Sequence, residues 1–353
     1  MRGGWAEGVH GRGCALVKAE LMPPSALGES ERAAWRAMAA AAPDTRRAFF
    51  APGFARACET AHGRARVAVL HEGGALRGFL PLQFATGWHR AAGLAERIGG
   101  ELNDAAGLVA LAGVQVNPRA LLRQAGIGAL FITHLTEGQA ARGLASEAEE
   151  IGHVIDLSGG GAAYHAALDA EFQRDTARRL RRAEREFGPL RFEFDPHPDA
   201  AAALALIGRK RAQYARTGAA DPFAVPGPLR LIAALCEASA PDCQPTLARL
   251  WAGERVLAAH FGLLCHGVLS YWFPVYDPAA EKVSPGRLLL WHLTGQAEAC
   301  GITLIDRGAG DNPAKRDFST GTRRFGTANL AAGGMRGGIA RLAQAAQWRL
   351  AAR

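Results

Sequence analysis

Residues 260–318 read HFGLLCHGVLSYWFPVYDPAAEKVSPGRLLLWHLTGQAEACGITLIDRGAGDNPAKRDF. Two runs within this stretch, residues 263–276 and 302–305, are rich in aliphatic and aromatic side chains and predict buried strands. A mostly apolar segment at 288–299 separates them and predicts a helix. The stretch therefore predicts a strand–helix–strand unit of an α/β fold, and the rest of the chain is interpreted around it.

A turn stands immediately before the predicted helix. Ser284, Pro285 and Gly286 interrupt the apolar pattern, and proline is well suited to the first turn of a helix. The first backbone N–H groups of a helix have no partner within it, so this turn is suited to binding a phosphate. An ordinary crossover connection with a tight turn explains the same residues, and the stretch alone leaves both interpretations open.

The length and the charge of the chain set its outer bounds. At 353 residues the chain predicts two domains. Its formal net charge is +8, but only four basic residues are lysines, and arginine, alanine and glycine are abundant. This skew is typical of genome composition, so the positive charge does not predict a nucleic-acid partner.

The cysteines and the apolar runs indicate a cytoplasmic protein. The six cysteines form no Cys-x-x-Cys pair, which favours reduced thiols and predicts no zinc site and no other metal. Residues 1–13 contain no apolar segment typical of a signal peptide. The uncharged run at 105–116 is about half as long as a membrane span requires, so we expect none. The oligomeric state is not predicted.

The order of predicted elements repeats along the chain. Two helices followed by a hairpin occur around Gly73 and again around Gly253, 180 positions later. We therefore predict two copies of one α/β unit. The expected boundaries are a loosely ordered arm at 1–27, a first unit at 28–165 and a second unit at 166–353, which begins with a connecting helix.

The connecting helix is rich in arginine. Residues 172–187 carry six arginines and only a narrow apolar stripe, and Gly188 with Pro189 ends the helix. Most of these arginines are interpreted as solvated partners of glutamates. Arg174 and Arg178 are the two predicted to face an anionic substrate.

Three motifs together resemble a known family. They are the aromatic run at 271–277, the turn at 284–289, and the sequence DRGAGDNPAK at 306–315. They resemble the GNAT-type acetyltransferases of the CelD/BcsL group, which is linked to cellulose and exopolysaccharide biosynthesis and related to FemAB-like tandem-GNAT transferases. Arg307 and Ala314 depart from the family's pattern, which has an aromatic or apolar residue and a tyrosine there.

The resemblance implies a fold and a co-substrate. The implied fold is α/β (α+β), with two tandem GNAT-like units, each a mixed, mostly antiparallel sheet flanked by helices. The first unit is expected to be degenerate and the second to bind acetyl-CoA or another acyl-CoA. By position in that fold, the implied co-substrate contacts are Phe273, Val275, Ser284, Gly286, Arg287 and Leu288. The usual glycine-rich pyrophosphate loop is replaced here by SPGRLL.

Acyl transfer also requires a base and a place for the acceptor. The candidate catalytic residues are His260, Tyr271, Asp306, Asp311 and Lys315. His260 has a suitable intrinsic pKa, although its interpretation as a core histidine is slightly favoured. The candidate substrate-binding residues are Trp272, Asn103, Asp104, Arg174 and Arg178. Tyr271 and Trp272 alternate along one strand, so one is expected to face the site and the other the core.

The resemblance predicts an enzyme, an acyltransferase that moves an acyl group, expected to be acetyl, directly to an amine or hydroxyl. The expected acceptor is a sugar, a sugar nucleotide or a polysaccharide precursor. One alternative is a FemAB-like transferase whose donor is an aminoacyl-tRNA; only this interpretation includes a nucleic acid. Another is a non-catalytic GNAT-like accessory protein of polysaccharide biosynthesis.

Overall fold

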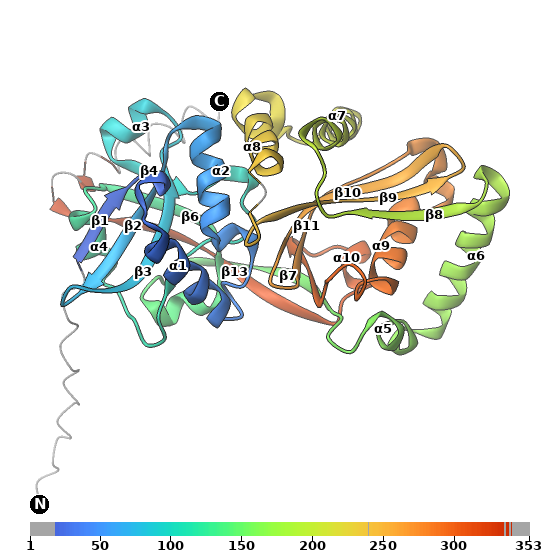
Figure 1. Cartoon of the computed structure of the whole chain (residues 1–353), viewed down its shortest axis with the longest axis horizontal. Coiled ribbons are helices and arrows are strands. Elements are labelled where there is room, and N and C mark those ends of the chain that lie inside the picture. Colours follow the sequence, from blue (N-terminus) through green and yellow to red (C-terminus); the bar gives the residue numbers. More distant parts are fainter. Residues whose placement is uncertain (1–17, 239, 335–336, 339, 341–353) are drawn as a thin grey trace, which may run out of the picture.

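A computed structural model describes residues 18–238, 240–334, 337, 338 and 340. Thirteen strands form one continuous sheet in the order β1-β2-β3-β4-β6-β13-β7-β12-β11-β10-β9-β8, and β5 pairs with β3 outside this path. Among the pairings between these strands, β4 with β6 and β11 with β12 are parallel and the others are antiparallel. The predicted mixed, mostly antiparallel sheet flanked by helices is confirmed (Figure 1).

The first unit holds the elements up to β7. Its strands and helices are β1 (Lys18–Met22), α1 (Glu29–Ala41), α2 (Pro52–His62), β2 (Ala65–Glu72), β3 (Ala75–Gln83), α3 (Gly87–Ala92), β4 (Leu94–Arg97), β5 (Val109–Ala110), α4 (Pro118–Gln124), β6 (Ala129–Thr136) and β7 (Ala148–Asp156). Short 3-10 turns are η1 (Pro24–Ala26), η2 (Ala48–Phe50), η3 (Gly100–Leu102) and η4 (Glu137–Arg142).

The second unit repeats this order. It comprises α5 (Gly161–Ala167), α6 (Ala170–Phe187), β8 (Leu190–Asp195), α7 (Ala200–Thr217), η5 (Pro222–Ala224), α8 (Pro226–Glu237), β9 (Gln244–Ala252), β10 (Arg255–Cys265), β11 (Val268–Tyr276), η6 (Pro278–Val283), α9 (Pro285–Gly295), β12 (Leu304–Ala309), α10 (Pro313–Arg316) and β13 (Gly321–Ala331). The hairpins β2–β3 and β9–β10 lie at the offset of 180 residues that the sequence predicted.

The two units exchange their last strands. β13, the last strand of the second unit, pairs with β6 of the first, and β7, the last strand of the first unit, pairs with β12 of the second. β7 and β13 also pair with each other, which joins both halves into one sheet. In Figure 1 these two strands cross the middle of the molecule. The expected boundary at 165/166 stays a prediction, because strands on either side of it complete the other unit's sheet.

Two details differ from the sequence-based expectations, and a third expectation, a strand within the N-terminal arm, is not tested. The expected strand at 263–276 is broken by a hairpin turn, since His266 and Gly267 both have positive φ, 48° and 78°, as a tight turn between antiparallel strands requires. Part of the expected loose arm is ordered, because β1 pairs with β2 over five residues. The expected strand at 15–17 lies outside the described residues.

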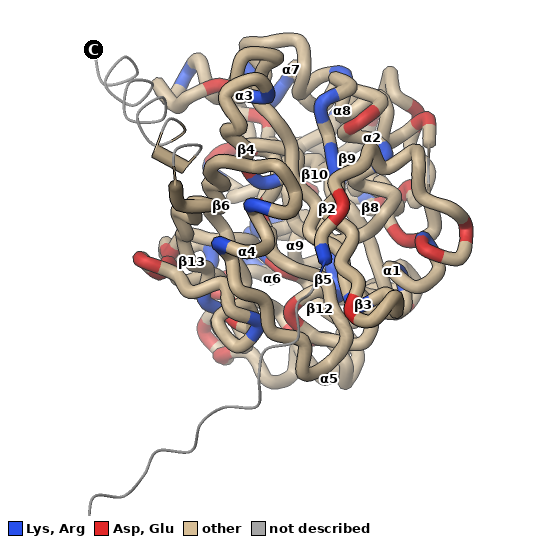
Figure 2. The backbone as a smooth tube through the Cα atoms, turned by 90° about the vertical axis from the view of Figure 1, so that its left-hand side faces the viewer, with Lys and Arg blue, Asp and Glu red and all other residues tan. Residues whose placement is uncertain are grey.

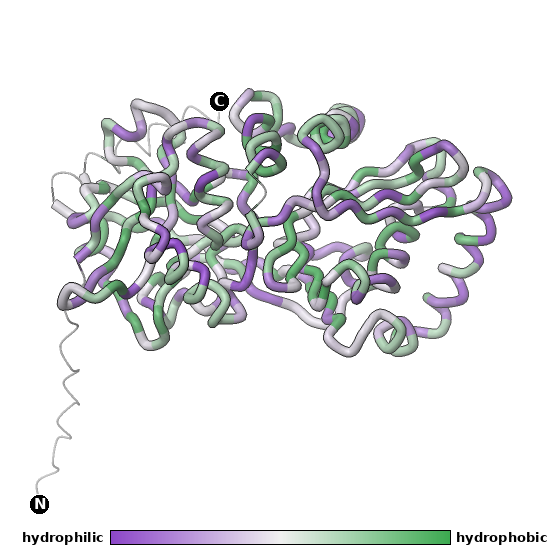
Figure 3. The backbone as a smooth tube through the Cα atoms, in the orientation of Figure 1, coloured by the Kyte–Doolittle hydropathy of each residue, from purple (hydrophilic) through white to green (hydrophobic). Residues whose placement is uncertain are grey.

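Helices cover both faces of the second unit's sheet. Helices α7 and α8 pack on one face and join a core shared with α1 and α2 of the first unit. Helices α9 and α6 lie on the other face, over a separate apolar cluster. Figure 3 shows α6 as mostly hydrophilic, as its arginines predicted. In Figure 2, seen from the end formed by the first unit, basic and acidic residues are interspersed.

Candidate functional site

Strand β11 bends where an extra residue enters its pairing with β10. Phe261 and Leu263 of β10 stand opposite Phe273 and Ser270 of β11, so two steps on one strand match three on the other. A bulge of this kind bends the strand and increases its twist. On its other side β11 pairs with β12 over only three residues, 268–270, and the two parallel strands are unpaired beyond them.

His260 stabilises this bulge. Its side chain is fully buried, and Nε2 accepts a hydrogen bond of 3.0 Å from the amide of Trp272. Burial, followed by the charges of Lys210 and Arg307, lowers the pKa of His260 to about 3. A general base needs an accessible lone pair, and this one is occupied by the backbone. The structure therefore favours the core interpretation of His260 over the catalytic one.

Tyr271 and Trp272 both pack into apolar clusters. Tyr271 stacks on the ring of His260 at 3.9 Å, and burial raises the pKa of its hydroxyl to about 12. Trp272 lies on the opposite face, against Phe49 of the first unit at 5.4 Å. The expected alternation of faces is present, but neither ring is exposed by more than 8%. Their assignment as catalytic and substrate-binding residues gains no support from this geometry.

The strand register determines which β11 amides face β12. The amide of Asp277 donates to the carbonyl of Leu257 on β10, at 2.8 Å. Hydrogen-bonded pairs alternate along an antiparallel ladder, so the amides of Phe273 and Val275 also point to β10. This corrects their expected role as donors to an acyl group. The alternate positions, Pro274 and Tyr276, face β12, and only Tyr276 has an N–H.

The N-terminus of α9 follows the end of β11, as expected. The amides of Arg287 and Leu288 already donate to the carbonyl of Ser284, at 2.9 and 3.2 Å. Gly286 is the first residue after Pro285, which has no N–H, and a side chain placed at Gly286 would meet nothing within 4 Å. Among the predicted phosphate contacts, the Gly286 amide is therefore the one suited to an anion.

The side chain of Arg287 is committed to α6. Its guanidinium lies 3.8 Å from the ring centroid of Phe172 and donates to the carboxylate of Asp175 and the hydroxyl of Thr176, at 2.9 and 2.7 Å. These contacts fix α9 against α6 and occupy the guanidinium of Arg287. The expectation that Arg287 adds charge-assisted bonds to a phosphate is corrected accordingly.

Arg179 of α6 is the basic residue that reaches the turn. Its Nη1 donates to the hydroxyl of Ser284 at 2.8 Å, and its Nε contacts Asp175. Arg174 and Arg178, which the sequence singled out, are exposed on α6, and Arg178 pairs with Asp175. The sequence showed that this helix is basic but not which arginine it turns toward Ser284, because that depends on how α6 packs on α9.

Asp306, at the end of the β11–β12 pairing, forms a buried ion pair with Arg47 of the first unit. Its other oxygen accepts from the amide of Gly308 at 2.9 Å. Both partners are at least 95% buried, so separating them would leave an uncompensated charge. The pair holds the two units together at the middle of β12. This geometry gives Asp306 a structural role in place of the expected catalytic one.

Lys315 and Asp311 stabilise the turn after β12. The ammonium of Lys315 donates to the carbonyls of Gly308 and Ala309, at 3.2 and 2.5 Å. Asp311 accepts from Arg316 at 2.7 Å and contacts Nε2 of His153 at 2.9 Å, and these bonds lower its pKa. Their assignment as catalytic residues stays a prediction, and their present contacts are those of a structured loop.

Asp104 approaches the same strand end from the first unit. A side chain placed at Gly308 would lie 3.4 Å from a carboxylate oxygen of Asp104. Burial raises the pKa of Asp104 to about 7, with Arg97, Asp306 and Lys315 as the charges around it. A carboxyl with this pKa is suited to take a proton at neutral pH. Its neighbour Asn103 is fully buried and holds its own loop through Ile98 and Ala105.

Lys210 is a residue that the sequence did not single out as functional. It projects from α7, is 9% exposed, and donates from Nζ to the carbonyl of Pro274 at 2.9 Å. Burial lowers its pKa to about 8. Because Pro274 faces β12, this ammonium lies at the unpaired side of β11. The scarcity of lysine was the only signal in the sequence, and it does not identify a role.

No group of three His, Cys, Asp or Glu side chains within the described residues is arranged to hold a metal ion. No described helix is both long and apolar enough to cross a membrane.

Known proteins resemble this chain at the level of one domain and of the fold. Residues 170–316, from α6 to α10, match the family described as "Acetyltransferase (GNAT) domain". A conserved protein of unknown function from Bacteroides thetaiotaomicron VPI-5482 is similar in structure, with a TM-score of 0.55 and 10% identity over 86% of this chain and 98% of that one. FemX also has a TM-score of 0.55, with 11% identity over 83% and 95% of the two chains.

These comparisons bear on the fold more than on the reaction. At 10–11% identity the two structures share a fold with this chain and nothing finer. No protein with a curated description matches the sequence significantly. The matched segment contains α6, the bulged strand β11, the turn at Ser284 and most of the loop after β12. Residues 170–316 thus match a GNAT acetyltransferase domain, which supports an acyltransferase.

Proposed function

We propose that this protein is an acyl-CoA-dependent N- or O-acyltransferase, with acetyl-CoA as the expected donor and a sugar, sugar nucleotide or polysaccharide precursor as the acceptor. One observation carries the proposal. Within the segment matched by the GNAT acetyltransferase family, the parallel strands β11 and β12 stop pairing after three residues, and α9 follows β11 after the short 3-10 helix η6. The resemblance to the CelD/BcsL group supplies the acceptor class, and the protein is proposed to act in the cytoplasm.

The residues at the start of α9 fit the phosphates of a CoA donor. A side chain placed at Gly286 would meet nothing within 4 Å, and Arg179 contributes a guanidinium at the hydroxyl of Ser284. Together they supply a backbone donor at a helix N-terminus and a charge-assisted donor, which is the combination that phosphates favour. In this proposal Ser284, Gly286 and Arg179 bind the donor, while Leu288 is a core residue.

A bound thioester supplies an electrophilic carbonyl, and the remaining requirements fall to this chain. Asp104 takes the proton from the acceptor amine or hydroxyl. The amide of Tyr276 and the ammonium of Lys210, both on the β12 side of β11, stabilise negative charge on the acyl oxygen. The base thus comes from the first unit and the oxyanion donors from the second, so both units are needed for one site.

Binding of acetyl-CoA tests the donor directly. We expect acetyl-CoA at millimolar concentration to raise the melting temperature of the wild-type protein. Gly286→Asp should abolish this shift, because a carboxylate would repel the phosphates. Gly208→Asp is a matched control, since Gly208 also lies in a helix and a side chain placed there would meet nothing within 4 Å. No shift for the wild type, or an equal shift for Gly286→Asp, would overturn the assignment.

The aminoacyl-tRNA alternative is favoured by one specific observation. Arg174, Arg178, Arg181 and Arg185 are all exposed and recur every three or four residues along α6. This spacing puts them on one face of the helix, where they form a stripe suited to phosphates. A steep loss of donor binding with salt that Arg181→Ala makes shallower would support this alternative. Binding of acetyl-CoA with no acyl transfer would instead support the accessory-protein alternative.

A further inference from the structure

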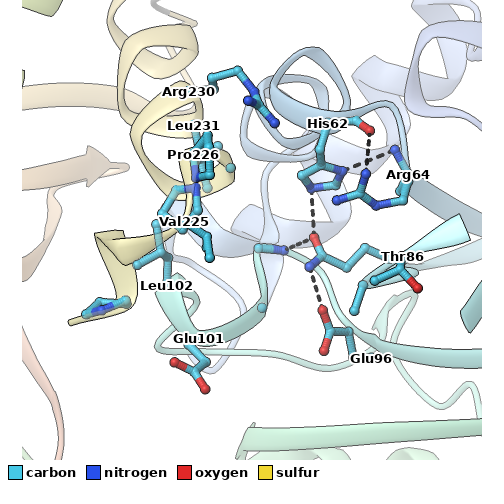
Figure 4. Close-up of a pocket in the computed structure, with 17 residues that line it drawn as sticks. His62, Arg64, Thr86, Glu96, Glu101, Leu102, Val225, Pro226, Arg230 and Leu231 are labelled. Atoms are coloured by element: carbon cyan, nitrogen blue, oxygen red, sulfur yellow. Dashed lines mark hydrogen bonds between the residues drawn. The ribbon is translucent and has the colours of Figure 1, made fainter. Parts of the chain in front are cut away.

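A cavity of about 480 Å³ lies between the two units, away from α9. Its walls come from the end of α2, from β3 and β4, from η3, and from η5 with the start of α8 (Figure 4). The polar side chains that line it include His62, Arg64, Gln83, Glu96, Glu101 and Arg230. A volume of this size accommodates a small organic ligand.

A chain of hydrogen bonds forms one side of the cavity. Nδ1 of His62 accepts from the amide of Arg64 at 3.1 Å, so Nε2 carries the proton and donates to Gln83 at 3.0 Å. Gln83 then donates to Oε1 of Glu96 at 2.7 Å, and burial raises the pKa of Glu96. These bonds fix a carboxyl group at the cavity wall with only Oε1 engaged by Gln83. Such a group is suited to accept a hydrogen bond from a ligand hydroxyl or amine.

Two guanidinium groups stand on another side. Arg230 is anchored through Nε to the carbonyl of Ala61 at 2.7 Å, and Arg64 through Nε to the carbonyl of Phe84 at 3.0 Å. After burial, the charges of both arginines lower the pKa of His62, so both lie near its ring. Nη1 of Arg64 also donates to the carbonyl of His62 at 3.4 Å, so Arg64 keeps one terminal nitrogen for a ligand and Arg230 keeps two. Two guanidiniums beside a neutral histidine favour a phosphate group.

Two segments that line the cavity also lie close to the proposed reaction centre. Leu102 lines the cavity, and Asp104 is two residues further, within about 7 Å along the chain. Pro222 also lines the cavity and follows Asp221. Burial, followed by the charges of Asp221 and Asp104, raises the pKa of the Tyr214 hydroxyl, so both carboxylates lie near that side chain. A ligand seated in the cavity is therefore positioned to extend toward Asp104.

We infer that this cavity binds the acyl acceptor, and that the acceptor is a phosphorylated, hydroxyl-rich small molecule such as a sugar phosphate. The assignment as acceptor site rests on the proposed function. Arg64 and Arg230 bind the phosphate, and Glu96 accepts from a hydroxyl or amine. In the transfer, the acceptor oxygen or nitrogen bonds to the acyl carbon as the carbon–sulfur bond breaks. Asp104 receives the acceptor's proton, which ends on the departing CoA thiolate.

The test is calorimetric titration, without CoA, of glucosamine 6-phosphate, glucose 6-phosphate and the two parent sugars. We expect the phosphorylated sugars to bind and the parent sugars to bind at least about tenfold more weakly, as loss of a charge-assisted contact predicts. Arg230→Ala should weaken binding of the phosphorylated sugars by a similar factor. Arg119→Ala, an exposed arginine on α4 outside the cavity lining, should leave it unchanged.

Three outcomes overturn the inference: neither phosphorylated sugar binds at about 10 mM, where a 1 mM site would be mostly filled; the parent sugars bind equally well; or Arg230→Ala binds as the wild type does. Adding acetyl-CoA separates this inference from the proposed function. Phosphate-dependent binding without any acyl transfer would retain the cavity as a ligand site and contradict the transferase. Transfer to an acceptor whose binding ignores Arg230 would retain the transferase and contradict the cavity assignment.

Discussion

The two parallel strand pairs of the sheet occupy equivalent places in the two units but end differently. In the first unit β4 has four residues, and its last residue, Arg97, is buried and donates to the carbonyl of Gly100 and to the ring of His134 on β6. In the second unit β11 has nine residues and runs past its pairing with β12. The first parallel pair ends at a side chain that is hydrogen-bonded within its own unit, whereas the second pair is followed by the N-terminus of α9.

The helices that follow differ in the same way. Helix α4 has seven residues, and Asn117 caps it by accepting from the amide of Ala120 at 3.1 Å. Helix α9 has eleven residues, and Ser284 does not cap it; its hydroxyl accepts from Arg179 instead. A unit whose helix start has its backbone N–H groups already hydrogen-bonded is suited to a structural role. A unit whose N–H groups are available is suited to binding a ligand. We therefore assign acyl-CoA binding to the second unit, and the first unit contributes Asp104 to the site.

The largest effect is expected from substitution of Asp104, the proposed base, which lies beside Gly308 of β12. Asp104→Asn should lower kcat by about 10²–10⁴-fold, the usual contribution of a general base. The wild-type rate should rise with pH through about 7, the pKa of Asp104, because the carboxylate is the active form, and this dependence should be absent in the variant. Measured kcat/KM across pH 5.5–9 tests this; an unchanged profile would rule out Asp104.

Stability provides the control for that substitution. Burial raises the pKa of Asp104 in the folded state, so its ionisation destabilises the fold as pH rises from the unfolded pKa of about 4 through 7. Asp104→Asn should therefore melt at the same temperature as the wild type or higher at pH 8. Glu254→Gln, at an exposed position in the turn between β9 and β10 and outside the cavity lining, should change neither activity nor melting.

The second prediction concerns the ion pair between the units at the middle of β12. Arg47→Met should lower the free energy of unfolding by about 3–5 kcal/mol, because Asp306 would be left as a buried unpaired charge. Urea denaturation measures the loss. Adding Asp306→Asn to Arg47→Met should recover part of it, and additive losses in this double-mutant cycle would show that the two side chains are not coupled.

The third prediction tests whether the first unit contains a second acetyl-CoA site. Arg97→Ala removes the side chain that ends β4, yet acetyl-CoA should still bind with a stoichiometry of one, because α4 keeps its own cap. Of the charges acting on Asp104, that of Arg97 is the first to lower its pKa, so the pH dependence of the rate should move to higher pH. Two bound acetyl-CoA molecules per chain in calorimetry would contradict the comparison.

The smallest effect on stability is expected for Arg178, which is exposed on α6. Arg178→Ala should change the free energy of unfolding by about 0.5 kcal/mol or less, since it removes an exposed pair within one helix. Arg179→Ala should instead weaken acetyl-CoA binding about tenfold by removing a charge-assisted contact. Equal effects of the two substitutions on binding would contradict the assigned orientation of α6.

Part of the site could be predicted from the sequence because its signals are local. Pro285 and Gly286 predicted the start of a helix after an apolar strand, and α9 begins there. The residues whose predicted roles differ from the structure do so for one reason. Phe273 and Val275 were assigned from their position in the implied fold and His260 from its intrinsic pKa, but a strand bulge and the register with β10 decide where an amide or a ring nitrogen points. Register depends on the partner strand and leaves no local signature.

The sequence by itself determined the mixed α/β architecture, the repeated order of elements and the helix start at Ser284, since hydrophobic periodicity, turn residues and proline act over a few neighbouring positions. Only the tertiary structure decided that β7 and β13 exchange between the units and that Arg47 meets Asp306 across 259 positions of the chain. It alone brought Asp104 to Gly308 and turned Arg179 toward Ser284. These contacts join distant segments, and only packing of the whole chain determines which distant groups become neighbours.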